Sequence, residues 1–119
     1  MASRKLDKSE WQAFCDDLSK ALPVDDLRTT TASLAVDGEV AAEWVALLGV
    51  AYDPRSDSFE IALGGLEHRV RNPAILYVDK GPRGVAALEV IDGSGLRHGL
   101  RLDRPLKPAV RPRLSGKRV

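Results

Sequence analysis

The chain has 119 residues, of which 44% are hydrophobic and 29% charged, a composition typical of one globular domain that excludes a disordered chain. Its single cysteine, Cys15, excludes an internal disulfide and a zinc cluster built from several cysteines. The net charge of +1 is unevenly distributed, because residues 1–60 carry 6 Lys/Arg and 12 Asp/Glu whereas the remainder carries 12 and 5. This asymmetry favours self-association or an anionic partner for the basic half, unless the charges intermix in the folded chain.

The N-terminal residues and the longest apolar stretch together predict a cytoplasmic protein. Residues 1–8 are charged and lead into no apolar segment of the kind found in a signal peptide. The longest apolar stretch, Trp44–Tyr52, is far shorter than the roughly 20 residues that cross a bilayer. We therefore expect no membrane contact.

Residues 8–21 are predicted to form an amphipathic helix. Asp7 and Glu10 have the spacing of a capping box, and Leu6 and Trp11 occupy the two positions of a hydrophobic staple. The apolar residues of this segment recur at helical spacing and form one stripe, which we expect to pack in the core: Trp11, Phe14, Cys15, Leu18, Ala21 and Leu22.

After the helix the apolar period changes to two, which indicates strands. Asp37-Gly38 predicts a hairpin turn, and the even-numbered residues from Val40 to Tyr52, Trp44 among them, form the better core face of a long strand. Gly49 is expected to mark a bend or bulge in it. Val45 and Leu47 then face outward, and any self-association is expected to use them or an exposed sheet edge.

Turn residues separate the later candidate strands, with no helix between them. We therefore predict an α+β fold, in which the N-terminal helix packs on a curled antiparallel sheet of six or seven strands. One strand, with Leu34 and Val36 alternating with polar or small residues, is expected before the Asp37-Gly38 turn. The strands expected after the long strand are Phe59–Leu63, Leu66–Arg71, Ala74–Asp79, Val85–Ile91 and Leu96–Leu102.

Three segments resemble a known family: Leu6–Trp11, Ala42–Pro54 and Leu76–Pro82. The middle segment is the most specific, because its Trp, Gly, Tyr and Asp-Pro stand together. The three are similar to an uncharacterised bacterial family of small proteins that is catalogued only as a domain of unknown function. The resemblance covers about residues 6–102 and implies a stand-alone bacterial cytoplasmic domain with no assigned substrate, cofactor or catalytic residue.

Two histidines stand in similar patterns, within Leu66–Arg71 and Leu96–Arg101. His68 and His98 each alternate with apolar residues and share their face, while charged residues take the other face. If the two strands lie close, the imidazoles can meet in one pocket and act as a metal pair or an acid–base pair. We favour the alternative that each is hydrogen-bonded at a sheet edge, because no third ligand stands at a fixed spacing.

No other residues assemble a nucleophile, a base and an orienting group. Cys15 lies on the apolar stripe, so we expect a buried and inert thiol. The acidic residues of 53–60 lack the spacing and central glycine of a calcium loop, and the glycine-rich turns open no helix that could hold a phosphate. We therefore expect no cofactor, no metal and no enzymatic activity; an enzyme built on His68 and His98 is the alternative.

The C-terminal half concentrates basic residues, which raises the question of a nucleic-acid partner. Residues 104–119 contain three prolines and no acid, so we predict a flexible basic tail that follows a domain of residues 1–103. Contact with the phosphates of RNA or DNA is an alternative to a solubilising tail, but no aromatic residue stands nearby to stack on bases. The residues concerned are Arg69, Arg71, Arg97, Arg101, Arg104, Lys107, Arg111, Arg113, Lys117 and Arg118.

These observations favour a non-enzymatic interaction or structural protein that contacts itself or another protein. The polyanion-binding protein and the histidine enzyme remain as the two alternatives.

Overall fold

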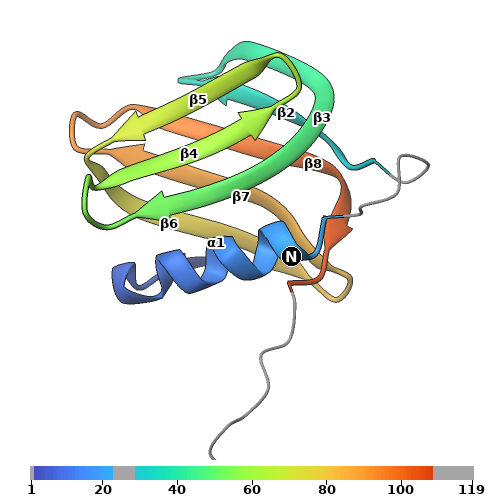
Figure 1. The fold of residues 1–119 in the computed structure, drawn as a ribbon, viewed down its shortest axis with the longest axis horizontal. Coiled ribbons are helices and arrows are strands. Elements are labelled where there is room, and N and C mark those ends of the chain that lie inside the picture. The colour runs from blue at the N-terminus through green and yellow to red at the C-terminus, as the bar shows by residue number, and fades with distance from the viewer. Residues whose placement is uncertain (1, 23–28, 109–119) are drawn as a thin grey trace, which may run out of the picture.

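The helix forms where its apolar stripe predicts it, in a computed structural model that describes residues 2–22 and 29–108 (Figure 1). A turn of 3-10 helix, Lys8–Glu10, leads into α1, Trp11–Lys20. The Asp7 side chain caps this turn by accepting from the Ser9 amide, because the tighter 3-10 geometry brings that amide into reach before Glu10. Of the two staple positions, Leu6 packs against the core that contains Trp11, and its carbonyl accepts a hydrogen bond from Trp11 Nε1 at 2.9 Å.

The described residues form one open sheet of eight antiparallel strands, rather than six or seven, in the order β1-β6-β7-β8-β2-β3-β4-β5. The additional strand is β1, which pairs with β6 in a register that sets Ser3 opposite Asp79. Its charged, polar sequence is typical of an edge strand and shows no apolar alternation, so periodicity could not reveal it. The strands are β1 Ala2–Leu6, β2 Thr31–Val36, β3 Glu39–Asp53, β4 Ser58–Leu63, β5 Leu66–Arg71, β6 Pro73–Gly81, β7 Gly84–Asp92 and β8 Arg97–Leu106.

The sheet curls into two layers because of how its end strands are connected. β5 is the last strand of the sheet, yet it continues into β6, the second strand from the other end, through Asn72 alone, which has a φ of 54°. β3 bends between the layers, pairing with β2 through its first half and with β4 through its second half. Figure 1 shows β3, β4 and β5 in front of β6, β7 and β8.

The helix α1 packs beside the second half of β3, where β2 no longer pairs with that strand. The Ser19 hydroxyl donates to the Val50 carbonyl at 2.7 Å and accepts from the Val50 amide at 3.0 Å, so a side chain replaces the missing strand. Trp11 is buried and meets the Tyr52 ring edge-on, with 5.1 Å between centroids. The helix therefore closes one side of the core.

The core face predicted for β3 is wrong over its first half. Two shifts of register displace the strand against β2, and a third lies between Leu47 and Gly49 where β3 meets β4. Each bulge adds a residue and reverses the face on which the following side chains lie. Leu47 is therefore buried and Val45 packs against the core, whereas Trp44 is exposed. The bulge expected near Gly49 is present.

The last strand is longer than its apolar alternation predicts. β8 continues to Leu106, which is buried and lies opposite Val85 on β7, so residues 104–106 belong to the sheet and not to a tail. Gly84 permits this pairing, because a Cβ there would lie 2.4 Å from the Leu106 carbonyl oxygen. Residues 109–119 of the predicted tail lie outside the described residues.

In the described part of the chain, no helix is long and apolar enough to cross a bilayer. The cytoplasmic location stays a prediction.

Candidate functional site

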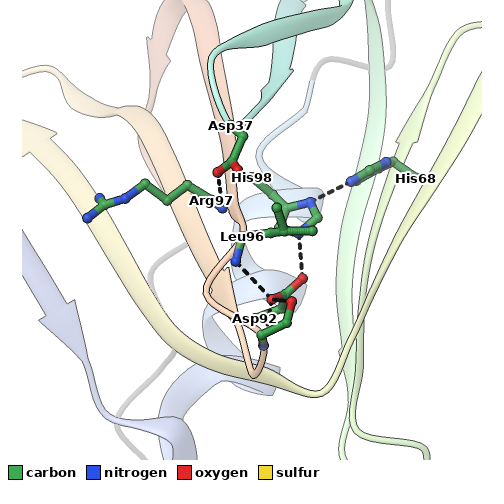
Figure 2. A network of polar contacts seen from close by, with 7 residues as sticks. Asp37, His68, Asp92, Leu96, Arg97 and His98 are labelled. Carbon is green, nitrogen blue, oxygen red and sulfur yellow. Dashed lines mark hydrogen bonds and ion pairs between the residues drawn. The ribbon is translucent and has the colours of Figure 1, made fainter.

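The two histidines meet across the interior of the curled sheet. His68 of β5 and His98 of β8 come from opposite layers, and His68 Nε2 lies 2.9 Å from His98 Nδ1 (Figure 2). His98 Nε2 in turn lies 3.0 Å from Asp92 Oδ2, at the end of β7. His98 is buried and His68 half-buried. The sequence pattern places each imidazole on the apolar face of its strand, and the curl brings them into contact.

The turn between β7 and β8 fixes the position of the Asp92 carboxylate. Asp92 Oδ1 accepts hydrogen bonds from the Ser94 amide and hydroxyl and from the Leu96 amide, at 2.9, 2.7 and 3.0 Å. The Ser94 hydroxyl, then His98, and then these amides hold the pKa of Asp92 well below its usual range. Asp92 is therefore an anion that only accepts hydrogen bonds, and its second oxygen is directed at His98 (Figure 2).

The ionised Asp92 determines where the imidazole protons lie. His98 Nε2 must carry a proton to bond to Asp92, which leaves Nδ1 of a neutral His98 as an acceptor. His68 must then donate from Nε2, and Nδ1 of a neutral His68 carries no proton. Burial, and then the nearby His98, lower the pKa of His68. His68 is thus neutral at pH 7.

The hydrogen-bonded series His68–His98–Asp92 resembles part of a catalytic triad but lacks a nucleophile. Asp92 orients His98 as a triad carboxylate does, yet His98 bonds to a second imidazole and not to a hydroxyl. The hydroxyl of Ser94 bonds to Asp92 instead. Among the described residues, no group of three His, Cys, Asp or Glu side chains is placed to hold a metal ion. The arrangement can share protons and join the two layers.

A polar contact also ties the hairpin between β2 and β3 to β8. Asp37 and Arg97 share two hydrogen bonds. The Asp37 amide donates to the Arg97 carbonyl at 2.8 Å, and the Arg97 amide donates to the side-chain Oδ1 of Asp37 at 3.1 Å (Figure 2). Asp37 and Gly38 both have positive φ values, of 52° and 85°, as the predicted hairpin turn requires.

The basic residues singled out in the sequence do not form one surface. Arg69 and Arg71 are exposed on β5, whereas Arg97 and Arg101 are exposed on β8, in the other layer. Two of the four are paired with carboxylates, since Arg69 bonds to Glu60 at 2.7 Å and Arg97 to Glu89 at 3.3 Å. Binding of a polyanion stays a prediction. The separation of these arginines over two layers gives it less support than their clustering in the sequence does.

The remaining basic candidates lie at or beyond the end of β8. Arg104 lies near the end of β8, where its Nε is 4.0 Å from the Asp103 carboxylate, and Lys107 follows the strand. The other four, Arg111, Arg113, Lys117 and Arg118, lie outside the described residues.

The thiol of Cys15 is buried in the core, on the apolar stripe of α1. It is fully buried, and this burial raises its pKa to about 12, so the thiolate that would act as a nucleophile or a ligand is absent at neutral pH.

The sequence missed a set of exposed apolar side chains on β3. Val40, Trp44 and Leu48 expose 63%, 46% and 63% of their surface. Trp44 has a φ of 48°, in the left-handed region that a bulky residue rarely adopts, and its amide donates to the Ser33 hydroxyl at 3.1 Å. The bulges of β3 turn these residues outward, and alternation alone carries no signal of bulges at Ala41 or Trp44.

A hollow of about 290 Å³ lies elsewhere, on the outer face of β6, β7 and β8. Tyr77, Asp79 and Arg101 are among its lining residues, and neither histidine is. It is separate from the His68–His98 pair.

Comparisons with known proteins agree with the resemblance seen in the sequence. A model described as Family of unknown function (DUF5335) matches residues 2–111. An uncharacterized protein of the bacterium Aquifex aeolicus (strain VF5) is 32% identical over 111 residues, which cover 92% of this chain and 96% of that protein. No solved structure matches the chain.

Proposed function

The chain belongs to the family of unknown function DUF5335, and we propose that it is a non-enzymatic module that binds a partner protein through the apolar side chains of β3. The observation that carries this proposal is the exposed Trp44 in a strained backbone conformation. Holding a non-glycine residue in the left-handed region costs about 1–2 kcal/mol. The fold gains the inward packing of Val45 from this bulge, but that packing does not need an indole at position 44, whereas a binding surface uses one.

The identity of the exposed residues supports a protein partner. Tryptophan is enriched among the few interface residues that provide most of the binding energy, because its large rigid ring buries much area at a small entropic cost. Val40 and Leu48 lie four residues to either side of Trp44 on the same strand, so further apolar surface is available along β3.

The position of these residues at a strand edge also favours a protein partner. β3 pairs with β2 on one side from Glu39 to Ala46, whereas its pairing with β4 begins at Leu47. The other edge of residues 39–45 therefore has no strand partner among the described residues. Free edges of this kind accept an extended segment of another chain, which pairs through its backbone.

Catalysis and polyanion binding have weaker support. The His68–His98–Asp92 chain satisfies its own hydrogen bonds and presents no nucleophile. The arginines of β5 and β8 are on different layers, two of them already paired with glutamates.

Sedimentation velocity and tryptophan fluorescence test the proposal. In a Trp11→Phe background, the remaining Trp44 reports directly on this surface. We expect its emission to shift to shorter wavelength as a complex forms, either with a second copy at rising concentration or with the purified partner. Trp44→Gly should prevent the complex while the fold is kept, because glycine adopts a positive φ without strain.

Leu66→Ser is the matched control, since Leu66 is also exposed but lies on β5. A complex that forms equally well with Trp44→Gly, or one that Leu66→Ser weakens more, would contradict the proposed surface.

A further inference from the structure

The contact between His68 and His98 joins two strands that are far apart in the sheet. β5 is an end strand whose register pairing is with β4, and β8 lies four positions away in the strand order. Across the interior, the hydrogen bond of 2.9 Å from His68 to His98 links the layers directly. Their rings are 5.1 Å apart between centroids. An apolar pair at these positions would join the layers equally well at any pH, so a titratable pair adds a dependence on protons.

Successive protonation has different consequences for this bond. The first proton can be accommodated, because a charged His68 still donates from Nε2 to the Nδ1 of His98, and a charged His98 donates to a neutral His68 whose proton has moved to Nδ1. With a second proton, all four ring nitrogens carry hydrogen. Two N–H groups then face each other, and two positive charges stand where the hydrogen bond was.

We propose that His68 and His98 form a proton-sensitive latch, which holds β5 against β8 while one imidazole is neutral and releases β5 when both are charged. The inference goes beyond the proposed function and does not depend on the Trp44 surface.

The charged groups around the pair determine how this latch responds. Asp92, at the end of β7, faces His98 and accepts a hydrogen bond from its Nε2. On the strand next to β5, Glu60 is the nearest carboxylate in register, but it bonds to Arg69 on the outer surface and does not reach the imidazoles. His68 thus has no carboxylate partner among the described residues, and the contact breaks only when a second proton charges both rings.

Hydrogen–deuterium exchange across pH tests the latch in the full chain. Between pH 7.5 and pH 5, amides of β5 should open more often, with a rise of up to about tenfold per pH unit after correction for intrinsic exchange. Amides of α1 should show no such rise. In the same range, NMR titration should give His68 a midpoint below the ordinary value of about 6.5 for histidine.

The variant His68→Gln is the critical control. The glutamine amide can donate to His98 from nearly the position of Nε2, and it takes up no proton, so we expect the acid-induced opening of β5 to disappear while the fold is kept. His68→Phe removes the donor and should open β5 at every pH. The latch is refuted if His68→Gln opens with acid as the wild type does, if the wild type shows no acid-induced opening, or if His68 titrates at its ordinary value.

Discussion

The two tryptophans show how differently the two ends of β3 are built. Trp11 is 1% exposed, meets Tyr52 edge-on beside the second half of the strand and donates to the Leu6 carbonyl. Trp44, in the first half, is 46% exposed and lies in a bulge. Apolar packing and the Ser19 hydrogen bonds hold the helix end, whereas polar contacts at Asp37 and Trp44 hold the hairpin end. One end therefore packs into the core, and the other carries the surface that we propose for binding.

The largest expected effect is the loss of Trp11. Trp11→Ala should lower the free energy of unfolding by about 3–5 kcal/mol, because it empties a large volume in the core and removes a hydrogen bond. Trp44→Ala should change it by less than about 1 kcal/mol. Urea denaturation of both variants measures this, and equal losses would remove the distinction between the two ends.

The helix end can be probed further at Ser19. Ser19→Ala should cost about 1–3 kcal/mol, because the amide and the carbonyl of Val50 both lose their partner. Gln12→Ala, on the exposed side of the same helix, should be within about 0.5 kcal/mol of the wild type. Thermal unfolding of the two variants gives the comparison, and similar losses would mean that Ser19 does not complete the strand.

The polar end should make stability depend on pH. Since the pKa of His68 is lowered by folding, its contribution is complete above about pH 6.5 and is lost as the pH falls through the lower folded value. The slope for one proton is at most about 1.4 kcal/mol per pH unit. Asp92, whose pKa is also lowered, adds stability that is lost only below about pH 4. The difference between the urea midpoints at pH 7.5 and pH 5.5 should be smaller in His68→Gln than in the wild type. An equal difference in the two proteins would assign the pH dependence to other groups.

The smallest expected effect is at Trp44 itself. Trp44→Gly should leave the free energy of unfolding within about 1 kcal/mol of the wild type, because glycine relieves the strain of a positive φ while losing some chain entropy. Trp44→Ala retains the strain and should be the less stable of the two. Chemical denaturation decides, and a large loss in Trp44→Gly would show that the indole supports the fold.

Local patterns predicted most of the elements but not their relation in space. The helix, the Asp7 cap of the 3-10 turn before it, the Asp37-Gly38 turn and seven strands follow from spacing and turn chemistry. The prediction fails at β1, because this segment is extended through its pairing with β6 and shows no apolar alternation of its own. It also fails in β3, where bulges reverse the face that points inward. Bulges depend on tertiary contacts, such as that between Trp44 and Ser33, which a single sequence does not display.

The candidate site shows the same division. The sequence placed His68 and His98 on apolar faces, but the sheet-edge interpretation that we favoured did not anticipate their contact, which arises only because the sheet curls. Asp92 was not singled out from the sequence, because its role in orienting His98 depends on the turn that its other carboxylate oxygen caps. Val45 and Leu47, expected to face outward, are inside, and Trp44 takes their place on the surface.

Site-specific photo-crosslinking tests the binding role of this surface most directly. A photoreactive phenylalanine analogue at position 44 should join the protein to a partner chain, or to a second copy, in the cells of its own organism. The same analogue at Arg55, exposed in the turn between β3 and β4, serves as the control and should give no such product. A product at position 44 alone is the result we expect; no product at either position, or equal products at both, would contradict a binding surface at Trp44.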